Sequence, residues 1–156
     1  MALPFDVTTQ EYIEVIYTLE QENRVARVTE IAERRGVTKA SVSLVMQQLQ
    51  QKELIDRKQY GHITLTPSGK RLGAQLMRRH QVISRFLNEV VGVAAETADH
   101  DACMLEHIIS TETFNAMRRF LDVLQHGSAE LRQAMEKMRT CDPKEAAPSE
   151  LCRGGN

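Results

Sequence analysis

Cys103, Glu106 and His107 are the residues of this sequence whose types and spacing are best suited to chemistry. At positions i, i+3 and i+4 of a helix they share one face, beside an apolar stripe that includes Ala102 and Leu105. A thiolate, a carboxylate and an imidazole together can bind a divalent transition metal. A small core cysteine beside a surface glutamate and histidine would explain the same residues, and this segment alone does not separate the two interpretations.

Two other segments carry residues of the same kinds. Glu11 and Glu14 stand three positions apart, so both carboxylates point to one side of the expected first helix. His80 lies within Arg-Arg-His-Gln in the middle of a long expected helix. Two acids on an amphipathic helix are usually a solvated face, and an isolated histidine is usually structural. Periodicity alone leaves open whether these residues meet Cys103.

The first 52 residues predict three helices, of which the last two form a helix-turn-helix. Apolar residues at helical spacing predict the first helix over 9–21, with Thr8 or Thr9 as its N-cap. A short helix over 28–35 and a longer one over 38–52 follow, separated by a turn that contains glycine. The residues expected to be buried on the third helix are Ala40, Val42, Val45, Met46 and Leu49.

The segments after the third helix predict a β-hairpin. Residues 54–58 and 62–66 alternate apolar and polar side chains, and Gln59-Tyr60-Gly61 between them suits a tight turn. A helix-turn-helix followed by a hairpin is a winged helix. Residues 24–80 carry twelve Lys or Arg against four Asp or Glu, whereas both flanking segments are net acidic. This charge pattern favours a polyanionic partner such as DNA.

The expected DNA contacts lie in the helix-turn-helix and the hairpin. Short polar side chains at the start of a recognition helix reach base edges and phosphates, and an alanine can touch a thymine methyl group. For any single residue, a helix cap or a solvated surface is an equally good interpretation. The residues predicted to contact DNA are Arg35, Thr38, Lys39, Ala40, Ser41, Ser43, Arg57, Lys58 and Tyr60.

The second half of the chain predicts helices only. A long helix is expected to begin at Thr66-Pro67, because proline is favoured at the first helical position, and to extend to about residue 90. The further helices are expected over 95–109, 111–125 and 128–139. The surplus of apolar faces on the helices after residue 81 favours a dimer. The sequence therefore predicts a mainly α protein with a winged helix-turn-helix DNA-binding domain over 1–72, an all-helical domain over 73–140 that carries the candidate metal ligands His80, Cys103, Glu106 and His107, and a flexible tail over 141–156.

The composition excludes several classes of protein. With 156 residues, of which 42% are hydrophobic and 26% charged, the chain is neither disordered nor collagen-like. Its apolar runs are shorter than the roughly 18–20 residues of a membrane span. Three scattered cysteines favour the reducing cytoplasm over a disulfide framework. Cys141 and Cys152 are interpreted as untethered thiols.

Five segments in order resemble the diphtheria-toxin-repressor family of metal-dependent transcriptional regulators, over nearly all of residues 7–125. They are Thr-Thr-Gln-Glu-Tyr-Ile-Glu-Val-Ile-Tyr, Ile-Ala-Glu-Arg-Arg-Gly-Val-Thr-Lys-Ala-Ser-Val-Ser, Leu-Thr-Pro-Ser-Gly-Lys, Arg-Arg-His-Gln and Asp-Ala-Cys-Met-Leu-Glu-His. The resemblance implies a homodimer that binds double-stranded operator DNA. It also implies metal ligands from the first helix, the linking helix and the Glu-His helix, which here are Glu11, Glu14, His80, Cys103, Glu106 and His107.

This ligand set combines two branches of the family. Glu11 is similar to the manganese branch and Cys103 to the iron branch, whose ancillary site has Ser84 and Asp99 here in place of a glutamate and a histidine. Asp99 or Asp101 could still add a ligand. The short chain is similar to the manganese branch, so the SH3-like third domain of the iron branch is not expected. The expected effector is Fe²⁺ or Mn²⁺, for which Zn²⁺ or Co²⁺ could substitute.

The expected function is metal-dependent repression of genes for iron or manganese uptake, with activation of an exporter as a variant. Metal would tie the first helix to the two other ligand-bearing helices and so fix the recognition helices of a dimer about 34 Å apart. The alternatives are a winged-helix regulator with a decayed metal site and a metal-dependent hydrolase with Glu106 as base. No phosphate-binding loop, nucleophile elbow or His-Glu-x-x-His pattern supports the hydrolase.

Overall fold

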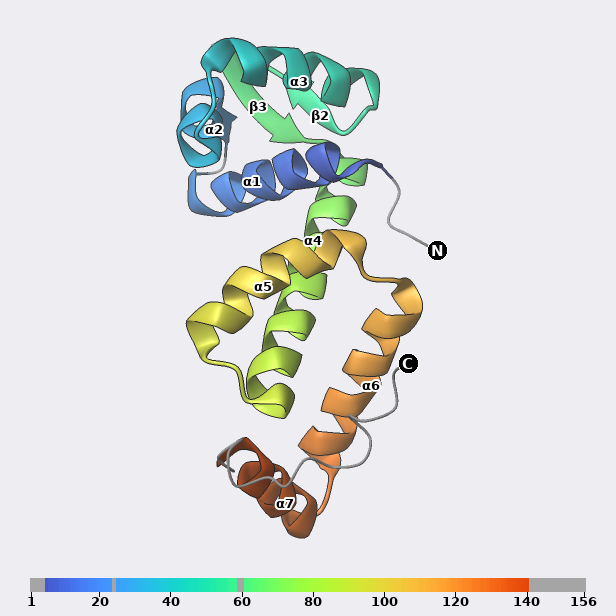
Figure 1. Cartoon of the computed structure of the whole chain (residues 1–156). Coiled ribbons are helices and arrows are strands. Elements are labelled where there is room, and N and C mark those ends of the chain that lie inside the picture. The colour runs from blue at the N-terminus through green and yellow to red at the C-terminus, as the bar shows by residue number, and fades with distance from the viewer. Residues whose placement is uncertain (1–4, 24, 59–60, 141–156) are drawn as a thin grey trace, which may run out of the picture.

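The computed structural model of this chain describes residues 5–23, 25–58 and 61–140. In these ranges a small sheet and three helices form one end of the molecule, and α4 leads from this end into a helical unit (Figure 1). The predicted mainly α fold is confirmed. The elements are α1 (Val7–Asn23), β1 (Ala26–Arg27), α2 (Val28–Arg35), α3 (Lys39–Gln51), β2 (Ile55–Arg57), β3 (His62–Leu65), α4 (Pro67–Arg85), the π-helical η2 (Phe86–Val91), α5 (Ala95–Ile108), α6 (Thr111–His126) and α7 (Ala129–Thr140).

α1 begins earlier than its apolar spacing predicted, because its N-cap is Asp6. The Thr9 amide donates to Asp6 Oδ1 at 2.9 Å, and Lys52 Nζ lies 2.9 Å from Asp6 Oδ2. The Thr9 amide and then the Lys52 ammonium hold the pKa of Asp6 well below its usual range. The prediction of Thr8 or Thr9 as the cap is therefore wrong, and the actual cap also ties α1 to the end of α3.

The helix-turn-helix forms as predicted. Gly36 ends α2 in the left-handed conformation, with φ 63°, and its neighbour Val37 donates its amide to the Ala32 carbonyl at 3.1 Å. Thr38 Oγ1 accepts from the Ser41 amide at 3.2 Å and caps α3. Because Thr38 is its cap, α3 begins at Lys39, directly after the loop that joins it to α2.

The face of α3 that was expected to be buried differs from the prediction at Ala40, and Val45 is only half-buried. Val42, Met46 and Leu49 are buried, but Ala40 is exposed and does not belong to the buried stripe. Leu44 is 63% exposed, although leucine is usually buried. The helix thus presents two apolar side chains to solvent among its polar ones.

The sheet contains a strand that the sequence did not predict. β3 lies between β1 and β2, and both neighbours run antiparallel to it. Ala26 in β1 pairs with Ile63, and Ile55 in β2 pairs with Leu65. β1 joins the end of α1 to the hairpin and completes a three-stranded wing.

α4 packs closely on the winged-helix unit. A Cβ atom added at Gly73 would lie 2.5 Å from Tyr17 Cδ2, and one added at Gly69 would lie 2.1 Å from the Leu54 carbonyl oxygen. Leu72 and Leu76 of α4 join the core that α1, α2, α3 and the sheet share. Glycine therefore lets α4 approach both α1 and the start of β2.

The helical unit follows the predicted order with one correction. The long helix is α-helical only to Arg85, and η2 continues it to the turn at Gly92, which has φ 85°. α5 packs along α4, and α6 packs against α4 and η2 (Figure 1). None of the helices in the described ranges has the length and apolar character needed to cross a membrane.

Candidate metal centre and DNA-binding surface

Glu106 lies at the centre of the candidate site. Its side chain is 0% exposed, and neither carboxylate oxygen accepts a hydrogen bond from a residue that the structure describes. His80 Nδ1 lies 3.1 Å from Oε2 and His107 Nε2 lies 3.4 Å from Oε1, as ion pairs without hydrogen-bonding geometry. A buried carboxylate without donors is costly unless a cation neutralises it. The surroundings of Glu106 therefore suit a positive ligand.

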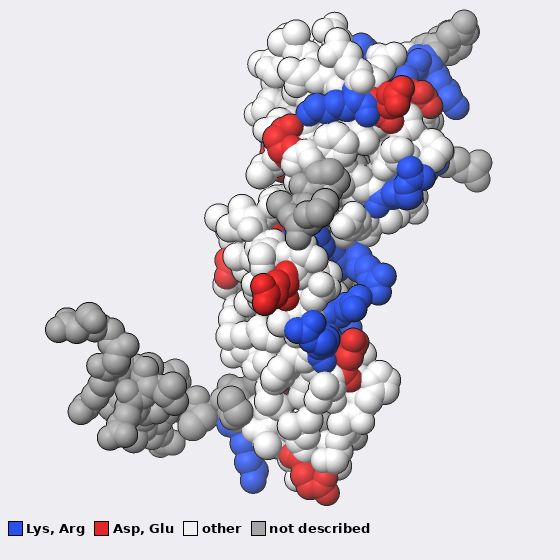
Figure 2. Space-filling model, turned by 90° about the vertical axis from the view of Figure 1, so that its right-hand side faces the viewer, with Lys and Arg blue, Asp and Glu red and all other residues white. Residues whose placement is uncertain are grey.

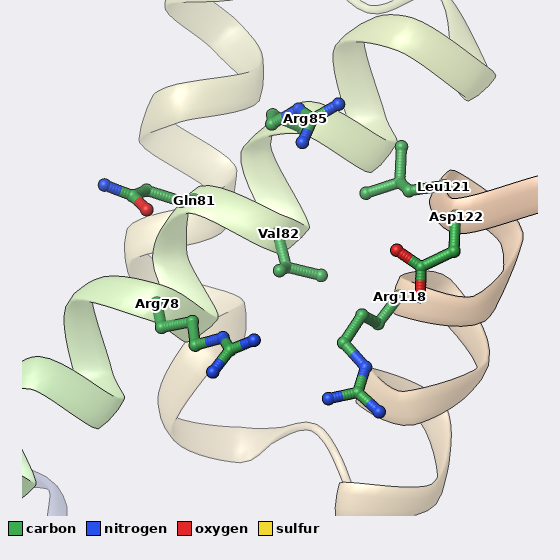
Figure 3. Close-up of a pocket in the computed structure, with 7 residues that line it drawn as sticks. All are labelled: Arg78, Gln81, Val82, Arg85, Arg118, Leu121 and Asp122. Atoms are coloured by element: carbon green, nitrogen blue, oxygen red, sulfur yellow. The ribbon is translucent and has the colours of Figure 1, made fainter. Parts of the chain in front are cut away.

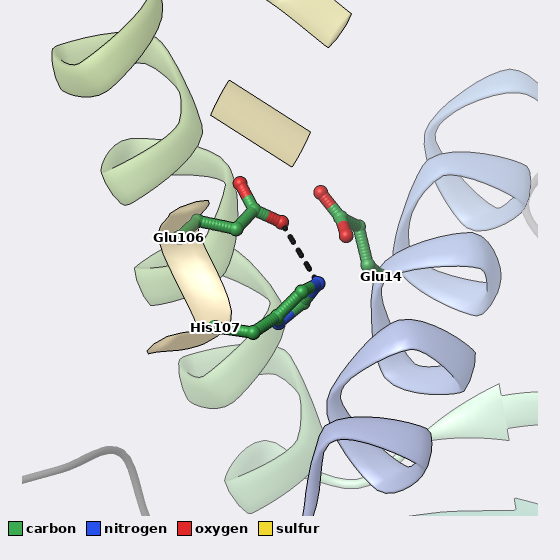
Figure 4. A group of neighbouring side chains, drawn as sticks. All are labelled: Glu14, Glu106 and His107. Atoms are coloured by element: carbon green, nitrogen blue, oxygen red, sulfur yellow. Dashed lines mark ion pairs between the residues drawn. The ribbon is translucent and has the colours of Figure 1, made fainter. Parts of the chain in front are cut away.

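Glu14 of α1 faces Glu106 and His107 of α5 (Figure 4). One ligand atom from each of the three side chains lies within 4.8 Å of the other two. Two carboxylate oxygens and an imidazole nitrogen are donors suited to Mn²⁺, Fe²⁺ or Zn²⁺. The fold thus joins residues 92 positions apart in the chain into a donor set that fits a divalent metal.

Gln10 orients His107, a role that sequence reasoning missed. Gln10 Nε2 donates to the Phe5 carbonyl at 2.8 Å, which turns Gln10 Oε1 toward His107 Nδ1 at 3.0 Å. Since an amide oxygen only accepts, His107 Nδ1 donates its proton to Gln10, and Nε2 is the ring nitrogen that faces Glu106. Such a partner on the second nitrogen is what orients a metal-binding histidine.

His80 of α4 bridges Glu106 and Asp99. Its Nε2 lies 2.8 Å from Asp99 Oδ1, on the side opposite to Glu106. The Glu106 carboxylate first, and Asp99 next, raise the pKa of His80 to about 9 against the opposing effect of burial. Asp99 therefore contacts His80 and does not join the three-residue group, and neither does Asp101.

Glu14 is held in its protonated form at neutral pH. Burial and then the negative charge of Glu106 raise the pKa of Glu14 to about 8. Together with His80 and the Cys103 thiol, the site without metal carries protons at three of its predicted ligands. Since metals bind the deprotonated ligands, a bound metal would displace these protons.

Glu11 and Cys103 line the same hollow without joining the group. Glu11 Oε2 accepts from Arg35 Nη2 at 2.6 Å. Cys103 is exposed, and its partial burial and then Glu106 raise the pKa of its thiol. The hollow measures about 280 Å³, and its lining residues are Glu11, Glu14, Val15, Thr18, Arg34, Arg35, Met77, His80, Cys103 and His107.

The residues predicted to contact DNA divide into three groups. Most of them are exposed on the winged helix, namely Thr38, Lys39, Ala40, Ser41, Arg57 and Lys58. Ser43 is half-buried and donates its hydroxyl to the Lys39 carbonyl at 2.9 Å, while Arg35 turns to Glu11. Tyr60 lies outside the described residues, as do Cys141 and Cys152. Lys and Arg side chains also gather along one side of the molecule, across both units (Figure 2).

A second hollow of about 310 Å³ lies between α4 and α6 and shares no residue with the first. Arg78 and Arg118 extend into it from the two helices, beside Asp122 (Figure 3). Arg85 at its edge pairs with Glu89 at 2.8 Å. Its polar side chains are mainly basic, so the hollow does not suit a metal cation.

Comparison with known proteins identifies both halves of the chain. Residues 5–63 match the N-terminal DNA binding domain of the iron dependent repressors, and residues 66–141 match their metal binding and dimerisation domain. The chain is 38% identical over 117 residues to the HTH-type transcriptional regulator MntR of Geobacillus thermodenitrificans, covering 75% of this chain and 80% of that protein. The MntR of Bacillus subtilis is 35% identical over 117 residues, with 75% and 80% covered.

Solved structures show the same arrangement. The manganese regulator SloR superposes with a TM-score of 0.64 at 26% identity, over 73% of this chain and 53% of that one. A manganese-dependent transcriptional repressor in complex with manganese gives 0.67 at 29% identity, over 73% and 52%. The chain thus spans about half the length of these solved chains.

Fold, site and matches together define a metal-dependent, DNA-binding transcriptional regulator. This chain belongs to the iron-dependent repressor family, which confirms the resemblance stated from its five segments. The family's DNA-binding domain and its metal-binding and dimerisation domain are both present, so the predicted homodimer on operator DNA is also confirmed.

Proposed function

We propose that this chain is a cytoplasmic repressor, and not an enzyme, that binds operator DNA when Mn²⁺ or Fe²⁺ occupies the group around Glu106. The observation that carries the proposal is the fully buried Glu106 carboxylate, which has no hydrogen-bond donor among the described residues. Glu14 and His107 offer ligand atoms beside it, within 4.8 Å. A metal ion there would bind a carboxylate that the described residues otherwise leave without a hydrogen bond, beside the charge of His80.

The proposed ligand set is larger than this group. Carboxylates favour Mn²⁺ or Fe²⁺, whereas a thiolate adds affinity for softer ions such as Zn²⁺ or Co²⁺. Support comes from relatives, since one similar structure is a repressor in complex with manganese and another is ScaR with bound Zn²⁺. The proposed ligands are Glu11, Glu14, His80, Cys103, Glu106 and His107, with Asp99 positioning His80.

Metal binding would couple the two units of the molecule. Glu14 belongs to α1 in the winged-helix unit, and Glu106 and His107 belong to α5 in the helical unit. The bound ion supplies the positive charge that lets carboxylates from both units share one site. In a dimer this contact fixes the two recognition helices at the spacing of about 34 Å that successive major grooves require. We place the division between the units in α4, with a DNA-binding domain over 1–72, a metal-binding and dimerisation domain over 73–140, and a tail over 141–156.

The proposed DNA contacts are the exposed polar and basic residues of α3 and the wing. The exposed start of α3 supports this assignment, because base edges are read from the first turns of a recognition helix. Arg57 and Lys58 would bind phosphates from the hairpin. The full proposed set is Arg35, Thr38, Lys39, Ala40, Ser41, Ser43, Arg57, Lys58 and Tyr60.

The test is fluorescence anisotropy of the full chain on DNA from its own upstream region. The protein is first chelated, then titrated anaerobically with Mn²⁺ or Fe²⁺ at fixed salt, because salt alone changes DNA affinity. We expect a tightening of about 100-fold with metal. Glu106→Gln should abolish the tightening, whereas Glu112→Gln, at an exposed acid of α6, should keep it. Equal affinity with chelator and metal would instead favour a metal-independent winged-helix regulator.

A further inference from the structure

Arg35 forms an ion pair with Glu11, which is one of the proposed metal ligands. Arg35 Nη2 donates to Glu11 Oε2 at 2.6 Å, and the side chains of the pair are 29% and 31% exposed. The guanidinium carbon also lies 5.3 Å from the centre of the Tyr12 ring, next to Glu11 in the chain. Carboxylate and ring together hold a cation beside the candidate metal site.

This contact leaves the guanidinium incompletely satisfied. Arg35 Nε is buried and has no hydrogen-bond partner among the residues that the structure describes. An unpaired buried donor opposes the ion pair that buries it. The Arg35–Glu11 ion pair therefore forms with only part of the hydrogen bonds that a guanidinium can donate.

Arg35 and Arg34 also line the hollow that five of the six proposed ligands line, all except Glu106. A fixed positive charge in the wall of a cation site repels the incoming metal. The Glu11 oxygen that accepts from Arg35 is engaged by this donor, so a metal ligated by that oxygen would have to displace it. Metal and guanidinium thus compete for the same carboxylate.

We propose that Arg35 is an internal counter-ion that competes with the metal for Glu11 and so raises the metal concentration at which the repressor becomes active. The inference rests on the proposed function, because it requires Glu11 to be a ligand. On metal binding, Glu11 exchanges the guanidinium for the ion. The released guanidinium lies at the end of α2, three residues before the Thr38 cap of the recognition helix.

Arg34 provides a matched control. It carries the same charge, precedes Arg35 in α2 and lines the same hollow. Its guanidinium pairs with Glu22 near the end of α1, which is not a proposed ligand. A repulsion that acts only through space should therefore be removed by substituting either arginine, whereas competition for Glu11 depends on Arg35 alone.

The experiment measures Mn²⁺ binding to the full chain by calorimetry, without DNA. Arg35→Gln should bind Mn²⁺ about tenfold more tightly than the unchanged protein, since both the ion pair and its charge are lost. Arg34→Gln should stay within about twofold. In a Glu11→Gln background, Arg35→Gln should add little, because contacting residues act non-additively.

Thermal unfolding gives a second readout, and the Tm of the chelated protein does not depend on metal affinity. Arg35→Gln should lower the Tm of the chelated protein, which contains the pair, and leave the Tm at saturating Mn²⁺ unchanged, because the loaded protein has already broken it. Equal effects of Arg34→Gln and Arg35→Gln on Mn²⁺ affinity would overturn the inference, as would no effect of Arg35→Gln. If Glu106→Gln abolishes Mn²⁺ binding while Arg35→Gln changes nothing, only this inference fails. If the unchanged chain binds neither Mn²⁺ nor Fe²⁺, the proposed function itself fails.

Discussion

Three residues of the candidate site, Glu14, His80 and Cys103, carry protons that metal binding must remove. The pKa of Glu14 is raised to about 8 by burial and by Glu106, and the pKa of His80 to about 9 by Glu106 and Asp99. At pH 7 all three groups are therefore protonated without metal, and each must lose its proton to become a ligand. The metal is thus in competition with protons as well as with Arg35.

We predict that Mn²⁺ affinity rises steeply with pH between 6 and 8 and continues to rise up to pH 9. Below pH 8 the chain should release about three protons for each metal bound, from Glu14, His80 and Cys103. Calorimetry in buffers of different ionisation enthalpy measures this number. His126→Gln, which removes a histidine at the end of α6, should leave the release unchanged. An affinity that is flat from pH 6 to 9 would contradict the protonation states derived from burial and charge.

The sequence predicted which candidate residues lie side by side on one helix better than how their side chains are oriented. The i, i+3 and i+4 spacings placed Glu106 beside His107 and Glu14 beside Glu11, because helix geometry is local. The contact of Gln10 with His107 depends on how α1 packs on α5, which no local pattern encodes. The turn of Glu11 toward Arg35 depends in the same way on the packing of α1 and α2.

At the scale of elements, Gly73 sets the distance between α1 and α4. Its missing side chain makes room for Tyr17, whose Cβ would lie 2.8 Å from a Cβ atom at position 73. Gly73→Ala should therefore force the two helices apart and cost about 1–3 kcal/mol of unfolding free energy. Because α1 carries Glu14, the variant should also bind Mn²⁺ more weakly. Ala74→Ser, at the exposed neighbouring position, is the control in denaturant unfolding and calorimetry.

Asp6 ties the start of α1 to α3. It caps the helix through Thr9 and pairs with Lys52. Asp6→Ala should lower the unfolding free energy by about 1 kcal/mol, the usual effect of a lost N-cap. Since the folded state lowers the pKa of Asp6, this contribution is present above its unfolded value of 3.8 and is lost on acidification. In urea unfolding, the loss of unfolding free energy caused by Asp6→Ala should be smaller at pH 3 than at pH 7. Asp56→Ala, on an exposed residue of β2, should cause no such pH-dependent loss.

Element prediction succeeded where the pattern was long and failed where it was short. α5 and α6 extend over 14 and 16 residues and were expected within one residue of their ends. β1 has two residues, too few to show alternation, and exists only because β3 offers it an antiparallel partner. η2 keeps the apolar spacing of a helix, so its π-helical hydrogen bonding was not distinguishable from the α-helix before it.

At the scale of the whole molecule, the helical unit leaves large apolar side chains in solvent. Met104 and Ile108 of α5 are 63% and 71% exposed, and Val123 of α6 is 59% exposed. Residues of this kind at the surface of a dimerisation domain are the expected contacts with a second copy. Because a dimer places two recognition helices on one DNA, the loss of this contact should also reduce DNA affinity.

We predict that Val123→Glu shifts the metal-loaded protein from dimer toward monomer in sedimentation velocity. A charge at this position would have to be desolvated on association, which costs far more than it does at a solvated surface. Gln125→Glu places the same charge on the same helix at an exposed polar position and should remain a dimer. The monomeric variant should still bind Mn²⁺, because Glu14, Glu106 and His107 belong to one chain, but it should bind operator DNA at least about tenfold more weakly. A Val123→Glu protein that stays dimeric would place the interface on another face of the helical unit.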